Sequence, residues 1–205
     1  MSDARELTVA TVAASPEPVT MPLEDPQADG ASLRPLRADD VDALAELLES
    51  FSPLTRRRWN LATYDRAMAR ELCDAIGRYD KLRLVVVDDR SDGLLLGLME
   101  LSFSVPPGDA ARYRRHGLPL DGDDVARFGP CLRDDRQGTG LASAAMPLVL
   151  DVAKRFGATR MILWGGVLAE NAPAISFYER WGFRRVGNFD DPTTGLPSID
   201  MQRPI

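Results

Sequence analysis

Apolar and polar positions alternate with helical or strand periods over most of the chain after residue 32. Apolar residues in segments 41–51 and 67–76 recur at helical spacing, so both segments predict amphipathic helices. Two apolar runs, 82–87 and 94–103, are separated by Asp, Ser and Gly residues and predict a hairpin. Gly97, inside the second run, predicts a bulge or a close approach to the backbone. A short strand at 33–36 precedes the helices.

The second half of the chain alternates between strand and helix patterns. Segments 125–132 and 159–164 predict strands, and each precedes a helical segment, at 141–156 and 171–181. Two closing strands are expected at 183–186 and 198–202. Strands that alternate with helices around one core predict an α/β fold.

Three segments lack a sustained period. Residues 1–31 contain four closely spaced prolines, and we expect a disordered tail followed by one domain over 32–205. Residues 56–59, three arginines and a tryptophan, predict a loop. Residues 104–124 are rich in Pro, Gly and charged side chains, and they predict a long loop of the kind that is functional or mobile.

Composition excludes several classes of protein. A length of 205 residues with 44% hydrophobic content suits one domain. The net charge of −6 argues against a nucleic-acid-binding surface. The sequence contains no run of about 20 apolar residues, so we expect no membrane-spanning helix. Two cysteines without a CxxC pattern and a single histidine indicate neither a disulfide scaffold nor a metal site. With no signal-peptide pattern, we expect a cytoplasmic protein.

A glycine-rich turn at 136–142 lies between the strand at 125–132 and the following helix. Gly138 and Gly140 have no Cβ, so the backbone there can approach a ligand closely. The first turn of the following helix adds unpaired N–H groups and the positive end of the helix dipole. This combination predicts a phosphate or pyrophosphate site.

Two common phosphate motifs do not fit this turn. A dinucleotide fingerprint needs a third Gly or Ala where this chain has Ser143, and an acid after the next strand, where Trp164 is followed by two glycines. A Walker loop needs a Lys-Ser/Thr pair after the glycines, and none is present.

Two motifs together resemble the GNAT N-acetyltransferase superfamily. Gln137, Gly140 and Ala142 match its Gln/Arg-x-x-Gly-x-Gly/Ala loop. Residues 171–183 look like its Asn-x-x-Ala-x-x-x-Tyr helix followed by Gly-Phe. The resemblance covers 32–205 and implies a single mixed, mostly antiparallel central sheet. That sheet would have about six to seven strands and about four flanking helices, with strands that splay at the cofactor site.

The resemblance also implies a reaction. Acetyl-CoA would be the co-substrate, without a metal, and a primary amine would attack the acetyl carbonyl directly. Tyr178 is the candidate general acid, or else a core aromatic. Glu100 is the candidate base or water-positioning group, or else a surface acid, and His116 is a weaker candidate. The residues assigned to the coenzyme are Cys131, Leu132, Arg133, Arg136, Gln137, Gly138, Thr139, Gly140, Leu141, Ala142, Asn171, Ala174 and Tyr178.

Other interpretations stay open at this point. Pro130 has no N–H to offer a coenzyme, which would move such contacts to residues 131–133. A chain that keeps the loop but lacks an aligned base would be a non-catalytic acyl-CoA-binding or sensing module. The acceptor is expected to be a small-molecule or protein amine, contacted by residues 50–63 and 104–124. The protein is expected to be a monomer or a homodimer.

Overall fold

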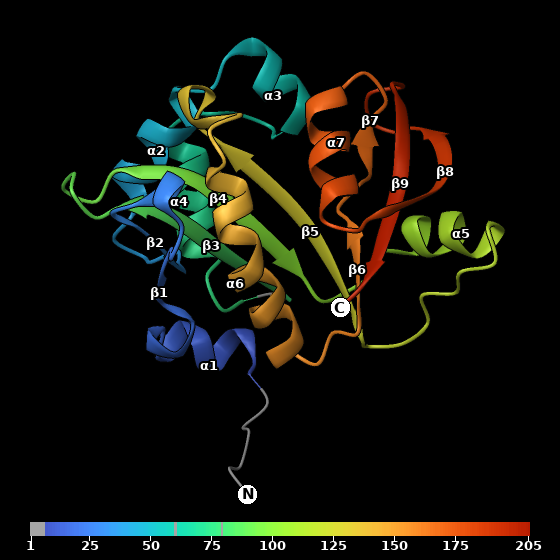
Figure 1. Ribbon diagram of the computed structural model, residues 1–205, viewed down its shortest axis with the longest axis horizontal. Coiled ribbons are helices and arrows are strands. Elements are labelled where there is room, and N and C mark those ends of the chain that lie inside the picture. The colour runs from blue at the N-terminus through green and yellow to red at the C-terminus, as the bar shows by residue number, and fades with distance from the viewer. Residues whose placement is uncertain (1–6, 60, 79) are drawn as a thin grey trace, which may run out of the picture. The chain divides into compact units, whose positions relative to one another are not determined.

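The computed structural model describes residues 7–59, 61–78 and 80–205 (Figure 1). These residues divide into two compact units. The first unit contains the described residues up to Leu101 together with Pro130–Phe156, and the second contains Ser102–Gly129 and Gly157–Ile205. Each unit has a hydrophobic cluster of its own.

The first unit places four strands side by side, in the order β1, β2, β3, β4. Strand β1 pairs antiparallel with β2, and β2 pairs antiparallel with β3, in a register that sets Leu33 opposite Val86. The strands are β1 (Met21–Pro22), β2 (Ala31–Pro35), β3 (Lys81–Asp88) and β4 (Leu95–Ser102). The helices are α1 (Val9–Ala14), α2 (Val41–Glu49), α3 (Pro53–Trp59), α4 (Arg66–Asp74) and α6 (Leu141–Arg155), with 3-10 turns η1 (Glu17–Val19), η2 (Pro26–Ala28) and η3 (Asp134–Arg136).

The core of the first unit forms where α2 and α4 meet the sheet. Leu44, Leu47 and Leu48 of α2 have no exposed surface, and they cluster with Leu72 of α4 and Leu98 of β4. Burying each such side chain stabilises the fold by about 1.5–3 kcal/mol. The helical spacing in 41–51 and 67–76 therefore predicted both helices, although in the second helix Ala67 is exposed and Ala69 and Cys73 are buried beside Leu72.

The N-terminal segment, expected to be a disordered tail, is ordered from Leu7 onward; residues 1–6 lie outside the described part. A reciprocal capping box between Thr8 and Thr11 starts α1, and Val12 and Val19 are buried. Strand β1 then adds to the edge of β2. This segment lacks a core of its own, but it buries apolar side chains by packing on its unit, which a periodicity search does not detect.

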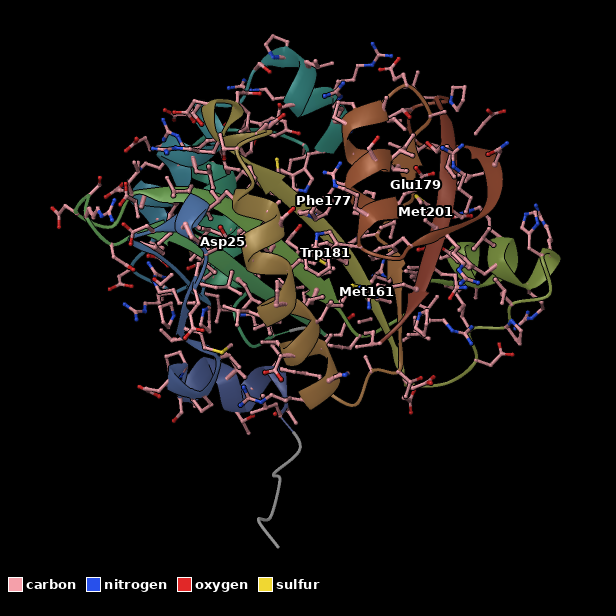
Figure 2. All side chains as sticks on the ribbon, viewed as in Figure 1. Asp25, Met161, Phe177, Glu179, Trp181 and Met201 are labelled. Carbon is pink, nitrogen blue, oxygen red and sulfur yellow. The ribbon has the colours of Figure 1, made fainter. Side chains whose placement is uncertain are left out.

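The second unit contains residues 125–129 of β5 and strands β6, β9 and β7 in that order, with β8 also paired to β9. Strand β5 pairs parallel with β6 over residues 125–128, and β9 pairs antiparallel with β6, β7 and β8. Figure 2 labels Met161 on β6 and Met201 on β9, which are both fully buried. The elements are α5 (Pro107–Arg115), β5 (Val125–Leu132), β6 (Arg160–Leu163), β7 (Val167–Leu168), α7 (Ala172–Arg180), β8 (Arg184–Asp190) and β9 (Pro197–Pro204).

The predicted class, α/β with mixed and mostly antiparallel strands, is confirmed, but the described chain has nine strands rather than six or seven. The two additional strands, β1 and β7, have two residues each, too few to show a two-residue period. More helices are present than the four expected.

Two segments predicted to be loops are helical. Residues 56–59, predicted to lie in a loop, belong to α3, which begins at Pro53, and the Ser52 hydroxyl accepts a hydrogen bond from the Thr55 N–H at 3.3 Å. Helix α5 lies in the 104–124 segment, and its buried residues are Asp109 and Tyr113. Because a polar residue occupies its inward face, no apolar period marked it.

Candidate active site

The glycine turn joins β5 to α6 through η3, in the first unit. Gly138 and Gly140 have positive φ angles of 74° and 91°, a backbone conformation that glycine adopts readily. A Cβ placed on Gly138 would meet no atom within 4 Å, so this stretch of backbone faces open space. Gly140 is the N-cap of the 15-residue helix α6, and no side chain in the described part of the chain caps that end. The uncapped N–H groups suit an anion.

Asp134 connects the glycine turn to helix α3 through hydrogen bonds. Its carboxylate accepts hydrogen bonds from the Ser52 N–H at 2.7 Å, the Ser52 hydroxyl at 3.1 Å and the Thr55 hydroxyl at 2.5 Å. Burial raises the pKa of Asp134, but the hydrogen bonds from Thr55 and Ser52 and the charge of Arg58 outweigh burial and lower the pKa below its ordinary value. The carboxylate is therefore ionised and engaged at neutral pH.

Gln137 holds the turn from its other side. Its Nε2 atom donates to the Thr55 hydroxyl at 3.1 Å and to the Leu132 carbonyl at 3.2 Å. The Thr139 hydroxyl donates a hydrogen bond to the Arg136 carbonyl at 2.8 Å, within the same turn. Gln137, predicted to contact the coenzyme, thus has a structural role in shaping the turn.

The end of β5 packs closely on β4. The Arg133 N–H donates to the Leu96 carbonyl at 3.0 Å, and a Cβ on Gly97 would lie 2.3 Å from Leu132 Cδ2 and 2.9 Å from the Cys131 oxygen. The close approach predicted at Gly97 is therefore confirmed. Burial raises the pKa of the Cys131 thiol, so this cysteine is a neutral buried group.

Glu100 lies inside the sheet of the first unit. Its side chain is buried on β4, and Oε1 accepts a hydrogen bond from Arg83 Nε at 2.7 Å. The interpretation of Glu100 as a surface acid is wrong, because an apolar strand with both faces covered holds it inside. Its partner Arg83 was not anticipated.

The second motif forms helix α7 in the second unit. Asn171 is its N-cap, and its Oδ1 accepts from the Ala174 N–H at 3.4 Å. Tyr178 is 7% exposed, and its ring contacts Phe177 and Phe183 edge-on at centroid distances of 5.3 Å each. Figure 2 labels Phe177 and Glu179 of α7 and Trp181, the C-cap of that helix. Asn171, Ala174 and Tyr178 share one face, as their spacing predicts.

His116 follows α5 and is exposed. A Cβ on Gly187 would lie 2.1 Å from the His116 Nε2 atom, so the imidazole packs directly on that glycine. Gly187 is placed at an irregularity in the pairing of β8 with β9. The weaker candidate base thus lies against β8.

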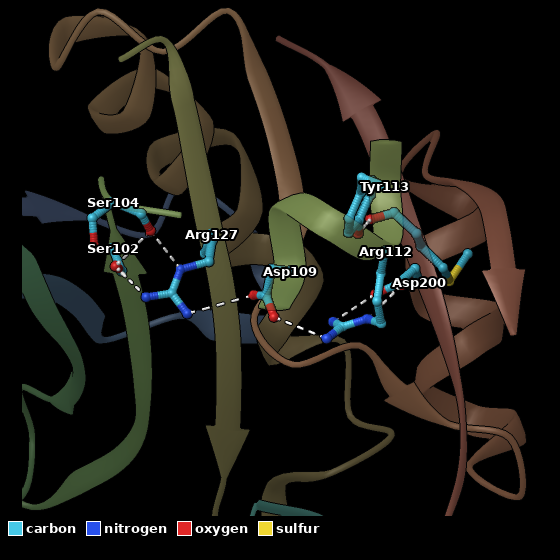
Figure 3. A network of polar contacts seen from close by, with 8 residues as sticks. Ser102, Ser104, Asp109, Arg112, Tyr113, Arg127 and Asp200 are labelled. Atoms are coloured by element: carbon cyan, nitrogen blue, oxygen red, sulfur yellow. Dashed lines mark hydrogen bonds and ion pairs between the residues drawn. The ribbon is translucent and has the colours of Figure 1, made fainter. Parts of the chain in front are cut away.

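A buried network of charged groups holds α5 in the second unit (Figure 3). Asp109 pairs with Arg112 on the same helix at 3.1 Å and with Arg127 of β5 at 3.7 Å. Arg112 also reaches Asp200 of β9 at 2.9 Å. Burial raises the pKa of Asp109, although Arg112 and Arg127 counteract this effect. The network explains how a helix with a polar inner face can be buried.

Further bonds complete that network. Arg127 donates to the Ser104 carbonyl at 2.7 Å and to the Ser102 hydroxyl at 2.8 Å. The Tyr113 hydroxyl donates to the Met201 carbonyl at 2.8 Å (Figure 3). The sequence offered no signal for these contacts, because their partners lie in separate strands and loops.

None of the helices in residues 7–59, 61–78 and 80–205 has the length and apolar character needed to cross a bilayer. Within the same residues, no three His, Cys, Asp or Glu side chains gather in a way that could hold a metal ion.

Comparison with solved structures identifies proteins of similar fold. The GNAT domain of S. lividans PAT is 21% identical, with a TM-score of 0.63 over 85% of this chain and 90% of that one. A spermidine N-acetyltransferase chimera from Vibrio cholerae is 20% identical, with a TM-score of 0.62 over 85% and 95%. An aminoglycoside acetyltransferase, AAC(6')-Ib in complex with coenzyme A, is 17% identical, with a TM-score of 0.64 over 85% and 94%.

A search of curated proteins found no match. The family model described as Acetyltransferase (GNAT) domain matches residues 32–184, which is more than half of the chain and includes both motifs. The resemblance seen in the glycine turn and in the α7 motif is therefore confirmed at the level of the family. This chain belongs to the GNAT acetyltransferase family.

Proposed function

We propose that this protein transfers an acetyl group from acetyl-CoA to a primary amine. The observation that carries the proposal is the glycine turn, whose backbone at Gly138 faces open space at the uncapped start of α6. Backbone N–H groups and a helix dipole can bind a pyrophosphate without a lysine, so these residues fit the coenzyme. The names of two similar structures, a spermidine and an aminoglycoside acetyltransferase, support an amine acceptor.

Residues of both motifs would have separate roles. Bound acetyl-CoA would supply the acetyl group as an activated thioester. Residues 138–142 would hold the pyrophosphate, and the Leu132 N–H would donate to the developing oxyanion. The Tyr178 hydroxyl would protonate the leaving sulfur as general acid. Its burial against Phe177 and Phe183 supports this role by fixing the direction of the phenol.

Glu100 is our proposed acceptor of the amine proton, directly or through water. Its place on β4, the strand on which the end of β5 packs, supports this role. Its ion pair with Arg83 favours a second candidate function, a non-catalytic acyl-CoA-binding module, because the pair already engages the carboxylate. Binding without turnover of any amine would identify that second function.

The binding step is tested by thermal unfolding with acetyl-CoA. A ligand at 100 times its dissociation constant stabilises the native state by about 2.7 kcal/mol, so the melting temperature should rise. Gly138→Ala should reduce that rise, because a methyl group would project into the open space. Gly195→Ala is the matched control: Gly195 also has a positive φ and open space, but lies in the turn between β8 and β9. No rise for the wild-type protein would reject the proposal.

The chemical step is tested by release of free thiol with pooled amines. Tyr178→Phe should lower kcat by about 10²-fold or more, with a small change in the KM for acetyl-CoA. Tyr113→Phe makes the same chemical change at the other buried tyrosine of this unit, whose hydroxyl bonds to the Met201 carbonyl. It should lower stability and leave kcat unchanged. Equal turnover in Tyr178→Phe and wild type would leave Tyr178 a packing residue.

A further inference from the structure

Two buried side-chain nitrogen atoms in the described part of the chain have no hydrogen-bond partner, Nε of Arg58 and Nε of Arg136. Buried polar atoms are nearly always hydrogen-bonded, so each exception calls for an explanation. Both arginines belong to the first unit. They come from segments far apart in the sequence, helix α3 and the turn η3.

The geometry brings these two arginines to the glycine turn. Arg136 is the last residue of η3, two positions before Gly138. Arg58 follows Thr55 by three residues on α3, so the two side chains share a face of that helix. That face meets the turn, because the Thr55 hydroxyl lies 2.5 Å from Asp134 Oδ1. The charge of Arg58 also acts on the Asp134 carboxyl.

Neighbouring arginines are already engaged. Arg56 donates to the carbonyls of Phe51 and Glu49, at 2.8 Å each. Arg133 pairs with Glu46 at 3.2 Å and with Asp135 at 3.5 Å. Asp134, on which the charge of Arg58 acts, has its oxygens engaged by Ser52, Thr55 and Gln137. Arg58 and Arg136 therefore retain donor capacity beside a site suited to an anion.

We propose that Arg58 and Arg136 bind the ribose 3′-phosphate of coenzyme A. This inference rests on the proposed function, in which the glycine turn holds the pyrophosphate. The 3′-phosphate is the remaining phosphate of the coenzyme, a monoester with a charge of about −2 at neutral pH. Guanidinium groups present several N–H donors in a planar fork that matches phosphate oxygens. Helix α3 thus contributes to coenzyme recognition.

The experiment compares coenzyme A with 3′-dephospho-coenzyme A by calorimetric titration. Wild-type protein should bind coenzyme A about tenfold or more tightly than the dephospho form, since charge-assisted hydrogen bonds are lost. Arg58→Met and Arg136→Met should each weaken coenzyme A binding about tenfold and change dephospho-coenzyme A binding less than about twofold. Arg58→Lys should retain part of the preference for coenzyme A over 3′-dephospho-coenzyme A. Arg57→Met, on the same helix, is the control for loss of one positive charge and should change neither affinity much.

Each outcome decides between the two proposals. If the wild-type protein binds neither ligand, the proposed function and this inference both fail. If it binds both equally, the 3′-phosphate site is rejected while the proposed function stands. An equal loss for both ligands in Arg58→Met would assign this arginine to the pyrophosphate and overturn the inference. Since both ligands are titrated into the same preparation, a misfolded fraction does not alter their ratio.

Discussion

Replacing Thr55 by valine tests the attachment of the glycine turn to α3. Thr55 is 4% exposed, and its hydroxyl donates to Asp134 at 2.5 Å and accepts from Gln137 at 3.1 Å. Valine has nearly the same shape, so the substitution removes both hydrogen bonds, together with a longer one from the Ser52 hydroxyl at 3.5 Å, and creates little cavity. Asp134 and Gln137 keep other partners, the Ser52 N–H and the Leu132 carbonyl.

The expected cost follows from those two bonds. A hydrogen bond to a charged group contributes about 1.5–3 kcal/mol and a neutral one about 0.5–1.5 kcal/mol. Because each partner retains another bond, we expect a total loss of about 2–3 kcal/mol. For a chain of this length, that loss lowers the melting temperature by about 4–12 °C. Thr55→Ser keeps the hydroxyl and loses one methyl group, at a cost of about 1 kcal/mol.

The pH dependence gives an independent check. The pKa of Asp134 is lowered in the folded protein from its ordinary value of 3.8. Its stabilising contribution is therefore complete above that ordinary value, and is lost as the pH falls through the folded pKa. In urea unfolding, the free energies of unfolding of wild type and Thr55→Val should differ by a constant amount near neutral pH, and this difference should decrease below about pH 4. Equal stability of Thr55→Val and Thr55→Ser, or a difference between wild type and Thr55→Val that is as large in acid as at neutral pH, would refute this reasoning.

Three other predictions concern packing and burial. Gly97→Ala should destabilise the protein by about 1–3 kcal/mol in urea unfolding, because a Cβ there meets Leu132 and Cys131. Gly108→Ala is the control and should change stability little, because open space surrounds Gly108. Burial raises the pKa of Cys73 to about 11 and also raises the pKa of Cys131. Neither thiol should therefore react with a disulfide reagent at neutral pH until the chain unfolds. Rapid reaction of the native protein would contradict this prediction. Arg83→Met should destabilise the fold by about 3–5 kcal/mol by breaking the buried ion pair between Arg83 and Glu100, and Glu100→Leu added to it should restore much of that loss.

The sequence determined those parts of the protein that depend on local pattern. Segment 125–132 was predicted to be a strand and is β5, and the helical spacing from residue 141 onward is α6. The glycine turn between them could be located because positive φ angles and close backbone approach need glycine itself. The resemblance of the chain to one family depended on a second motif, on α7. The helical period of 3.6 residues places Asn171 and Tyr178 of that motif on one face.

Only the tertiary structure determined what surrounds that turn. Thr55 and Asp134 are 79 residues apart, and no periodicity links two polar residues at such a separation. The same holds for α5, whose inward face carries Asp109 held by arginines from its own helix and from β5. Hydrophobic burial repeats along an element and so leaves a pattern in the sequence. Buried hydrogen bonds and ion pairs join single residues of distant elements, so no pattern in the sequence indicates that Thr55 meets Asp134.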